Sequence, residues 1–257
     1  MRTHKRTIDL NCDLGEGFGV YPSFQDEAMM ALITSANIAC GMHAGDPVIM
    51  EKTVHLAVSH GVRVGAHPGY PDLLGFGRRE MALAAEDIYA CVLYQIGALN
   101  AFTRQHGLPL AHVKLHGSLY NRAARDLAAA QAVIKAVKDF DSGLILVGLA
   151  GSHLIRLARE AGLRAAAEGF PDRAYEPDGS LQPRLQPGAV LHHPQEIAGN
   201  ALTLAREGIS ITREGKTDYI PVDTLCLHGD HPDAVENARA VRSMLEDEGI
   251  LIRRMEG

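Results

Sequence analysis

Seven short apolar segments of this chain follow one another, and most of them end in polar residues of the kind that enzymes use. The segments are Ile8–Asp13, Ser35–His43, Val62–His67, His112–His116, Leu144–Leu149, Arg164–Phe170 and Thr224–Asp230. All but Leu144–Leu149 end in or beside Asp, Asn, His, Lys or Glu. Parallel β/α barrels have buried strands and gather their active sites at the carboxyl ends of those strands. The pattern therefore predicts an enzyme whose site lies at one end of a barrel.

Segments with helical periodicity separate the predicted strands. They are Pro47–Ser59, Ala85–His106, Leu127–Phe140, Ser152–Gly162, Pro194–Glu207 and Pro232–Glu248. This alternation implies parallel strands joined by right-handed crossovers. We therefore expect an α/β fold, an incomplete seven-stranded parallel TIM-like barrel that forms one domain over residues 1–257. Leu251–Arg253 is a candidate for a short closing strand.

Three segments interrupt the alternation. Pro68–Arg79 is rich in Gly and Pro and is too long for a simple turn, which predicts a functional loop. Pro171–Val190 is polar and contains many turn-forming residues. Ile209–Pro221 predicts a hairpin that turns at Glu214 and Gly215.

Composition excludes several classes of protein. The net charge is −6 and no basic patch is present, so we expect no nucleic-acid partner. No apolar run reaches the roughly 18 residues that a membrane span needs, and Asp9, Asn11 and Asp13 interrupt the run that follows the basic N-terminus. We therefore expect a cytoplasmic protein without a membrane partner. None of the four cysteines forms a CxxC pair, as is typical of buried thiols in a reducing compartment.

The catalytic candidates come from the polar strand ends. Asp13 ends a strand in which Asp9 and Asn11 share its face, and Glu16 follows it. Lys114 and His116 also share one face, and a lysine in a buried strand needs an anionic partner or a phosphate. Glu168 lies late in another buried strand. We take Asp13, Lys114, His116 and Glu168 as catalytic candidates, whereas Asp9 is equally well explained as structural.

Other polar residues of the same loops are candidates for binding a substrate. They are Asn11, Asn37, His43, His67, Arg78, Arg79, Tyr120, His228 and Asp230. Arg78 and Arg79 can hold a carboxylate or phosphate, but a solvated pair or an ion pair between subunits explains them equally well.

A divalent metal is a further possibility, because His and carboxylate side chains are the usual ligands of zinc. The candidate ligands are Asp13, His43, His67, His116 and His228. No HxxxH, HExxH or HxH pair is present, so a metal site depends on these residues converging in the fold. The chain also lacks the GxxxxGK[ST] loop, GxGxxG after its first strand, and the GxSxG elbow.

The motifs DLNCDLGEGFG, SANIACGMHAGDP, GAHPGYPDLLGFGRR, YQIGAL, HVKLHGSLYN, DRAY and HGD resemble those of the LamB/YcsF family. This family provides the A subunit of the bacterial ATP-dependent 5-oxoprolinase, and the resemblance extends from Ile8 to about Gly249. Leu115, Ser118 and Pro171 stand where the family usually has Pro, Ala and Ala. These departures alter the backbone near Lys114 and His116 and leave the reactive groups in place.

The resemblance implies a seven-stranded barrel similar to the glycoside hydrolase/deacetylase superfamily. It also implies hydrolysis of 5-oxo-L-proline to L-glutamate, coupled to ATP as a co-substrate, in a complex with B and C subunits. Whether ATP contacts this chain stays open. Two alternatives also remain, a metal-dependent amide hydrolase that works without ATP and a subunit that only binds substrate.

The chemistry of lactam opening suggests a role for each candidate. Asp13 would be the general base, with a pKa that burial raises toward neutrality. Lys114 would hold the phosphate or the developing oxyanion. The four histidines His43, His67, His116 and His228 would orient the substrate or pass a proton to the ring nitrogen. Glu168 and Asp230 would fix these imidazoles or bind the ring N–H.

Overall fold

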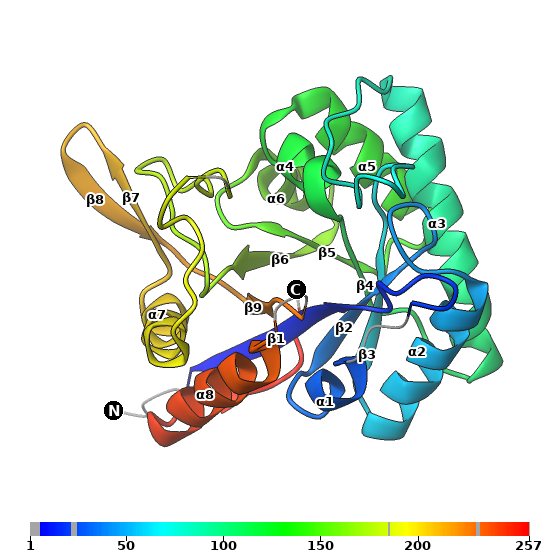
Figure 1. The fold of residues 1–257 in the computed structure, drawn as a ribbon. Coiled ribbons are helices and arrows are strands. Elements are labelled where there is room, and N and C mark those ends of the chain that lie inside the picture. Colours follow the sequence, from blue (N-terminus) through cyan, green and yellow to red (C-terminus); the bar gives the residue numbers. More distant parts are fainter. Residues whose placement is uncertain (1–5, 22–24, 185, 230–231, 257) are drawn as a thin grey trace.

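A computed structural model describes residues 6–21, 25–184, 186–229 and 232–256. Seven parallel strands form a barrel surrounded by helices (Figure 1). The barrel strands are β1 (Thr7–Leu14), β2 (Ser35–Ala39), β3 (Arg63–His67), β4 (His112–Lys114), β5 (Ile145–Leu149), β6 (Arg164–Gly169) and β9 (Thr224–Leu227). All seven predicted strands are confirmed, and so is the TIM-like fold class.

The barrel closes between its first and last strands. In β1, Asn11 lies opposite Ser35 of β2 and also opposite Cys226 of β9. Strand β10 (Leu251–Ile252) pairs with the start of β1, where Thr7 lies opposite Leu251. The predicted short strand is therefore present, but its predicted role in closing the barrel is wrong, because β9 makes the closing contact with β1.

The helices follow the predicted alternation closely. They are α1 (Asp26–Met30), α2 (Pro47–His60), α3 (Ala85–Gln105), α4 (Gly117–Arg125), α5 (Leu127–Phe140), α6 (His153–Glu160), α7 (Pro194–Arg206) and α8 (Ala234–Asp247). Side-chain caps begin α2 and α6, since Asp46 accepts hydrogen bonds from two N–H groups of α2 and Ser152 accepts one from α6. Helices α1 and α4 were not predicted, and α8 begins two residues later than expected.

The predicted hairpin is present as β7 (Ile209–Arg213) and β8 (Lys216–Ile220). It extends away from the barrel beside α7 (Figure 1). Among the described residues, no helix combines the length and the apolar character that crossing a membrane requires. The four cysteines are free thiols, and three of them are buried.

The interior of the barrel is unusually polar. Its strands bury the side chains of Asp9, Asn11, Ser35, Asn37, His67, His112, Lys114, Glu168 and Thr224. Buried polar groups destabilise a fold unless they are hydrogen-bonded. These side chains bond to one another across the barrel, as shown by the 2.7 Å contacts from Asn37 to Asn11 and from Ser35 to Asp9.

The C-terminal segment covers the amino end of this interior. Met255 is buried in an apolar cluster with Ile145, Val147 and Ala166. Its backbone N–H donates to Asp9 Oδ1 at 3.3 Å, and its carbonyl accepts a hydrogen bond from Arg63 at 3.0 Å. Polar side chains at the carboxyl end are therefore the ones placed to meet a substrate.

Gly65 of β3 makes room for one of the buried polar side chains. A Cβ atom at this position would overlap the imidazole ring of His112. His112 in turn contacts Asn37 Oδ1 at 2.7 Å, so moving its ring would break a buried hydrogen bond. The glycine is thus required by the polar interior of the barrel.

We predict that Gly65→Ala lowers the free energy of unfolding by about 1–3 kcal/mol, the usual cost of overpacking a core. Urea denaturation monitored by circular dichroism measures this change. Gly97→Ala in α3 is the matched control, because a Cβ there meets no atom within 4 Å. It should stabilise the protein by about 0.5–1 kcal/mol. Equal stability of Gly65→Ala and the wild type would contradict the prediction.

Candidate active site

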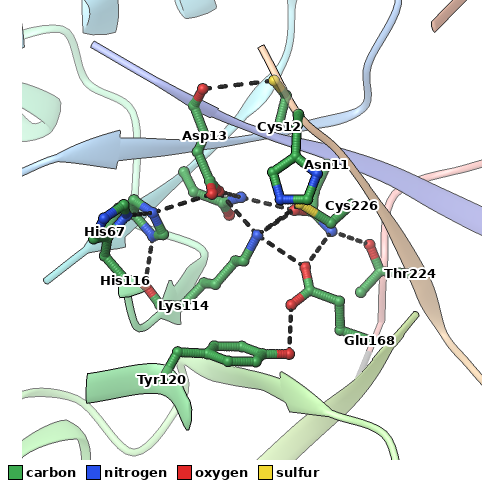
Figure 2. A network of polar contacts seen from close by, with 12 residues as sticks. Asn11, Cys12, Asp13, His67, Lys114, His116, Tyr120, Glu168, Thr224 and Cys226 are labelled. Atoms are coloured by element: carbon green, nitrogen blue, oxygen red, sulfur yellow. Dashed lines mark hydrogen bonds and ion pairs between the residues drawn. The ribbon is translucent and has the colours of Figure 1, made fainter. Parts of the chain in front are cut away.

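Lys114 lies at the centre of a buried polar network at the carboxyl end of the barrel (Figure 2). Its side chain is only 2% exposed. Its Nζ atom lies 2.9 Å from Asp13 Oδ1 and 3.0 Å from Glu168 Oε1. It also donates to Asn11 Oδ1 at 3.2 Å and to Cys226 Sγ at 3.0 Å. Burial alone would lower the pKa of Lys114, but Asp13 and the other anionic neighbours hold it well above its ordinary value. The ammonium is therefore charged at neutral pH.

Asp13 connects this lysine to the histidines of the neighbouring strands. Its Oδ1 atom accepts hydrogen bonds from Lys114 and, at 2.9 Å, from Asn37. Its Oδ2 atom lies 3.3 Å from His67 Nε2. Burial would raise the pKa of Asp13, but His67 and Lys114 outweigh it and hold this pKa well below its ordinary value. The expectation of a raised pKa is therefore wrong, because burial was weighed without the lysine and the imidazole that contact this carboxylate.

Glu168 is held in place by hydrogen bonds to both of its oxygens. Oε2 accepts a hydrogen bond from Tyr120 at 2.8 Å, and Oε1 accepts one from the Asn11 amide at 3.0 Å. The same amide donates to Thr224 at 2.7 Å. Tyr120 comes from the first turn of α4, directly after β4, which explains how a helix side chain reaches the barrel interior. Glu168 is thus fixed as the second anionic partner of Lys114.

A second cluster lies beside Asp13 and consists of Glu16, His43, His67 and His116. The Oε1 atom of Glu16 lies 3.1 Å from His43 Nε2, 3.2 Å from His116 Nδ1 and 3.8 Å from His67 Nε2. Gly15 adopts a positive φ of 68° after β1, and this turn places Glu16 over the ends of the strands. One potential ligand atom from each residue lies within 4.8 Å of the others.

The hydrogen bonds of two of these histidines determine which nitrogen carries a proton. His67 Nδ1 contacts the carbonyl of Lys114 at 2.8 Å, and His116 Nε2 contacts the carbonyl of Phe76 at 2.8 Å. Carbonyl oxygens only accept, so both of these nitrogens are donors. The remaining nitrogens, His67 Nε2 and His116 Nδ1, face each other at 3.0 Å. Two facing lone pairs at this distance require a proton or a metal ion close by.

The donor set fits a divalent metal. Three imidazoles and one carboxylate are ligands that zinc and related ions accept, and the backbone contacts of His67 and His116 orient their rings as ligands usually are. Burial lowers the pKa of His43 to about 3, so its ring is neutral as a ligand must be. The sequence prediction named His43, His67 and His116, which lie together, and Asp13, which lies beside them. It omitted Glu16, although the motif DLGEG contains it.

His228 lies apart from this cluster, at the end of β9. Its Nδ1 atom contacts Asp172 Oδ2 at 2.6 Å, and Arg184 contacts its Nε2 atom at 2.8 Å. It is therefore not a member of the metal-binding group that the sequence suggested. Asp230 lies outside the described residues, so its predicted role stays a prediction.

The arginines of the loop after β3 contact residues of the same loop. Arg79 forms an ion pair with Asp72. The guanidinium of Arg78 lies 4.9 Å from the centre of the Phe76 ring. The role of Arg78 and Arg79 in substrate binding stays a prediction. Asp72, the ion-pair partner of Arg79, was not identified from the sequence.

The sequence interpretation also assigned no role to His112 in the barrel interior. His112 lies two residues before Lys114, so strand alternation alone places it on the same face. Asp9 lies at the opposite end of the interior, where Ser35 and Thr224 donate to its carboxylate at 2.7 and 2.5 Å. This supports the structural interpretation of Asp9.

Residues 8–257 match the LamB/YcsF family. The chain belongs to this family. It is 55% identical over 252 residues to a protein of Methylococcus capsulatus that is named as the A subunit of 5-oxoprolinase, with 98% of this chain and 97% of the relative covered. A protein of the same name from Pyrococcus furiosus is 52% identical, with 95% and 96% covered.

Solved structures agree with this placement. The crystal structure of a lactam utilization protein from Thermus thermophilus superposes with a TM-score of 0.89 at 50% identity, covering 96% of this chain and 99% of that one. A family 4 carbohydrate esterase from Streptomyces lividans superposes with a TM-score of 0.50 at 11% identity, covering 96% and 91%. This second likeness shows only that the LamB/YcsF chain shares the barrel fold of the esterase.

We predict that Lys114→Met lowers the free energy of unfolding by about 3–5 kcal/mol, because it leaves Asp13 and Glu168 as uncompensated buried charges. Urea denaturation measures the loss, and adding Glu168→Gln should recover part of it. Lys135→Met is the control, since its ion pair with Asp139 is exposed and should contribute nothing measurable. A Lys114→Met variant as stable as the wild type would exclude this account of the network.

Proposed function

We propose that this chain is the A subunit of an ATP-dependent 5-oxoprolinase and contributes residues that open the lactam ring of 5-oxo-L-proline to give L-glutamate. Family membership and the names of its full-length relatives support the substrate. The observation that carries the chemistry is the position of Asp13. Its two oxygens contact a charged lysine and an imidazole of the histidine cluster, at 2.9 and 3.3 Å.

The reaction explains why ATP and further subunits belong to the proposal. A five-membered lactam is a stabilised amide, and the opened product closes again easily. Phosphorylation of the carbonyl oxygen makes the ring carbon a better electrophile. Water attacks that carbon, the C–N bond breaks as the ring nitrogen takes up a proton, and a second water hydrolyses the resulting acyl phosphate to glutamate and phosphate. We assign delivery of the nucleotide to partner B and C subunits in the cytoplasm, since this chain contains no GxxxxGK[ST] loop.

The residues of the site divide these tasks. Lys114 keeps its charge next to the reacting carbonyl, where it stabilises the phosphate or the developing oxyanion. Asp13 is ionised because Lys114 and His67 lower its pKa, so it accepts a hydrogen bond from the attacking water, orients it, and takes its proton as the water bonds to carbon. Glu168, oriented by Tyr120, positions Lys114.

The cluster of Glu16, His43, His67 and His116 would hold a divalent ion such as Zn²⁺. When bound, such an ion polarises a carbonyl or phosphoryl oxygen or lowers the pKa of a water molecule. In this proposal His116 is a metal ligand, because its Nδ1 atom lies beside Nε2 of His67. This role replaces the proton transfer that the sequence suggested for it.

We predict that the chain, combined with its B and C subunits, forms glutamate from 5-oxoproline only when ATP is present. Asp13→Asn should reduce turnover about a hundredfold or more, the usual effect of losing a general base. Asp218→Asn, on the exposed strand β8, is the matched control and should keep full activity. Glutamate and phosphate release in a coupled assay measure both.

Other outcomes of this assay favour the two alternatives. Hydrolysis by the isolated chain without ATP, abolished by a chelator, would favour a metal-dependent amide hydrolase. Full activity of the complex after both Asp13→Asn and Lys114→Met would leave only a binding role for this chain.

We also predict that the purified chain retains about one Zn²⁺ after incubation with zinc and desalting, as a set of three imidazoles and a carboxylate should. Mass spectrometry of the metal content measures this directly, independent of activity. Glu16→Gln and His67→Ala should each lose most of the ion. His153→Ala, at an exposed position of α6, should retain it. Equal zinc content in all four proteins would refute the assignment.

A further inference from the structure

A cavity of about 340 Å³ lies at the carboxyl ends of β6 and β9, where helices α7 and α8 cover them. Its lining includes the polar side chains of Asp172, Arg184, His192, His228 and Asn237, and also Cys226. This volume lies within the range of small-molecule pockets. The cavity is separate from the histidine cluster, none of whose members lines it.

Two residues that line this cavity each carry a buried side-chain oxygen without a hydrogen bond. Among the described residues, Asp172 Oδ1 and Asn237 Oδ1 have no partner. Buried polar atoms without partners are uncommon, because losing water without gaining a hydrogen bond costs free energy. Both atoms are acceptors, so the group that suits them is an N–H or O–H donor.

The same lining offers a cation. Arg184 donates to His228 Nε2 at 2.8 Å, and His228 Nδ1 in turn donates to Asp172 Oδ2 at 2.6 Å. A guanidinium has five N–H donors in a planar fork, which matches the geometry of a carboxylate. His228 bonds to Oδ2 of Asp172 and leaves Oδ1 without a partner. The cavity therefore combines an anion-binding group, Arg184, with a hydrogen-bond acceptor, Asp172.

The cavity is also connected to the charged lysine. Cys226 lines it and accepts the hydrogen bond that Lys114 donates at 3.0 Å. Phe170 is adjacent to both sites, since its ring centre is 5.6 Å from Lys114 Nζ and 5.8 Å from the ring centre of His228. A molecule bound in the cavity therefore lies next to the network that contains Asp13.

We propose that this cavity is the recognition subsite for the lactam, an inference that rests on the proposed function. Arg184 binds the carboxylate of 5-oxoproline, and the unpartnered oxygens of Asp172 and Asn237 accept its ring N–H. The carboxylate and the carbonyl of this molecule are attached to the two carbons that flank the ring nitrogen. Holding the carboxylate and the N–H in the cavity thus leaves the carbonyl to face Lys114.

Steady-state kinetics of the reconstituted complex test the role of Arg184. Arg184→Ala should raise KM for 5-oxoproline about tenfold or more, as expected for losing a charge-assisted hydrogen bond, with little change in kcat. Arg184→Lys should recover part of the loss, because it restores the charge without the fork. Arg156→Ala, which removes an exposed arginine of α6, should leave both parameters unchanged.

Two analogues distinguish the groups that are recognised. Inhibition by 2-pyrrolidinone, which lacks the carboxylate, should be equally strong in the wild type and in Arg184→Ala. The N-methyl derivative of 5-oxoproline lacks the N–H donor, so the wild type should bind it more weakly than 5-oxoproline. Asn237→Ala should reduce that discrimination.

The outcomes separate the subsite from the function. An active wild type whose KM is unchanged by Arg184→Ala and whose discrimination is unchanged by Asn237→Ala would overturn the subsite and leave the proposed function standing. A wild-type complex that makes no glutamate from 5-oxoproline would overturn the proposed function, and the subsite with it.

Discussion

The charge of Lys114 is the constraint on which the interior of this protein depends. An ammonium group removed from water is unfavourable unless anions and hydrogen-bond acceptors replace its hydration. Asp13 and Glu168 supply the anions from strands on opposite sides of β4 in the barrel, at 2.9 and 3.0 Å. The carboxylates are fixed in turn by Asn37 and Tyr120. The polar interior is thus one connected arrangement, in which each group restrains the next.

This arrangement relates stability to the proposed chemistry. A charge that is already desolvated and oriented stabilises a developing anion without further reorganisation. The same charge makes the stability of the barrel sensitive to mutation, because a buried charge needs its hydrogen-bond and ion-pair partners, whereas an apolar side chain at the same position would need none. Gly65 illustrates the packing that this polar interior requires, since only glycine at this strand position leaves room for the imidazole ring of His112.

The sequence was most informative where strand periodicity decides the outcome. Alternation placed Asp13, Lys114 and Glu168 in the interior, where their charged groups meet. The sequence was least informative where the pKa or the position of a side chain depends on residues that are distant in the chain. The pKa of Asp13 moves opposite to the expectation because His67 and Lys114 are its neighbours. His228 was grouped with the other histidines, but Asp172 holds it elsewhere.

The seal at the amino end of the barrel has a consequence for folding. The contact between Met255 and Asp9 joins residues 246 positions apart, and β1 lies between strands that come from early and late parts of the chain. Contacts of such large sequence separation carry a high loop-closure cost, because a long loop must close before any contact compensates for the lost entropy. A fold with many such contacts is expected to form slowly. Shielding Asp9 from water therefore requires the two ends of the chain to meet.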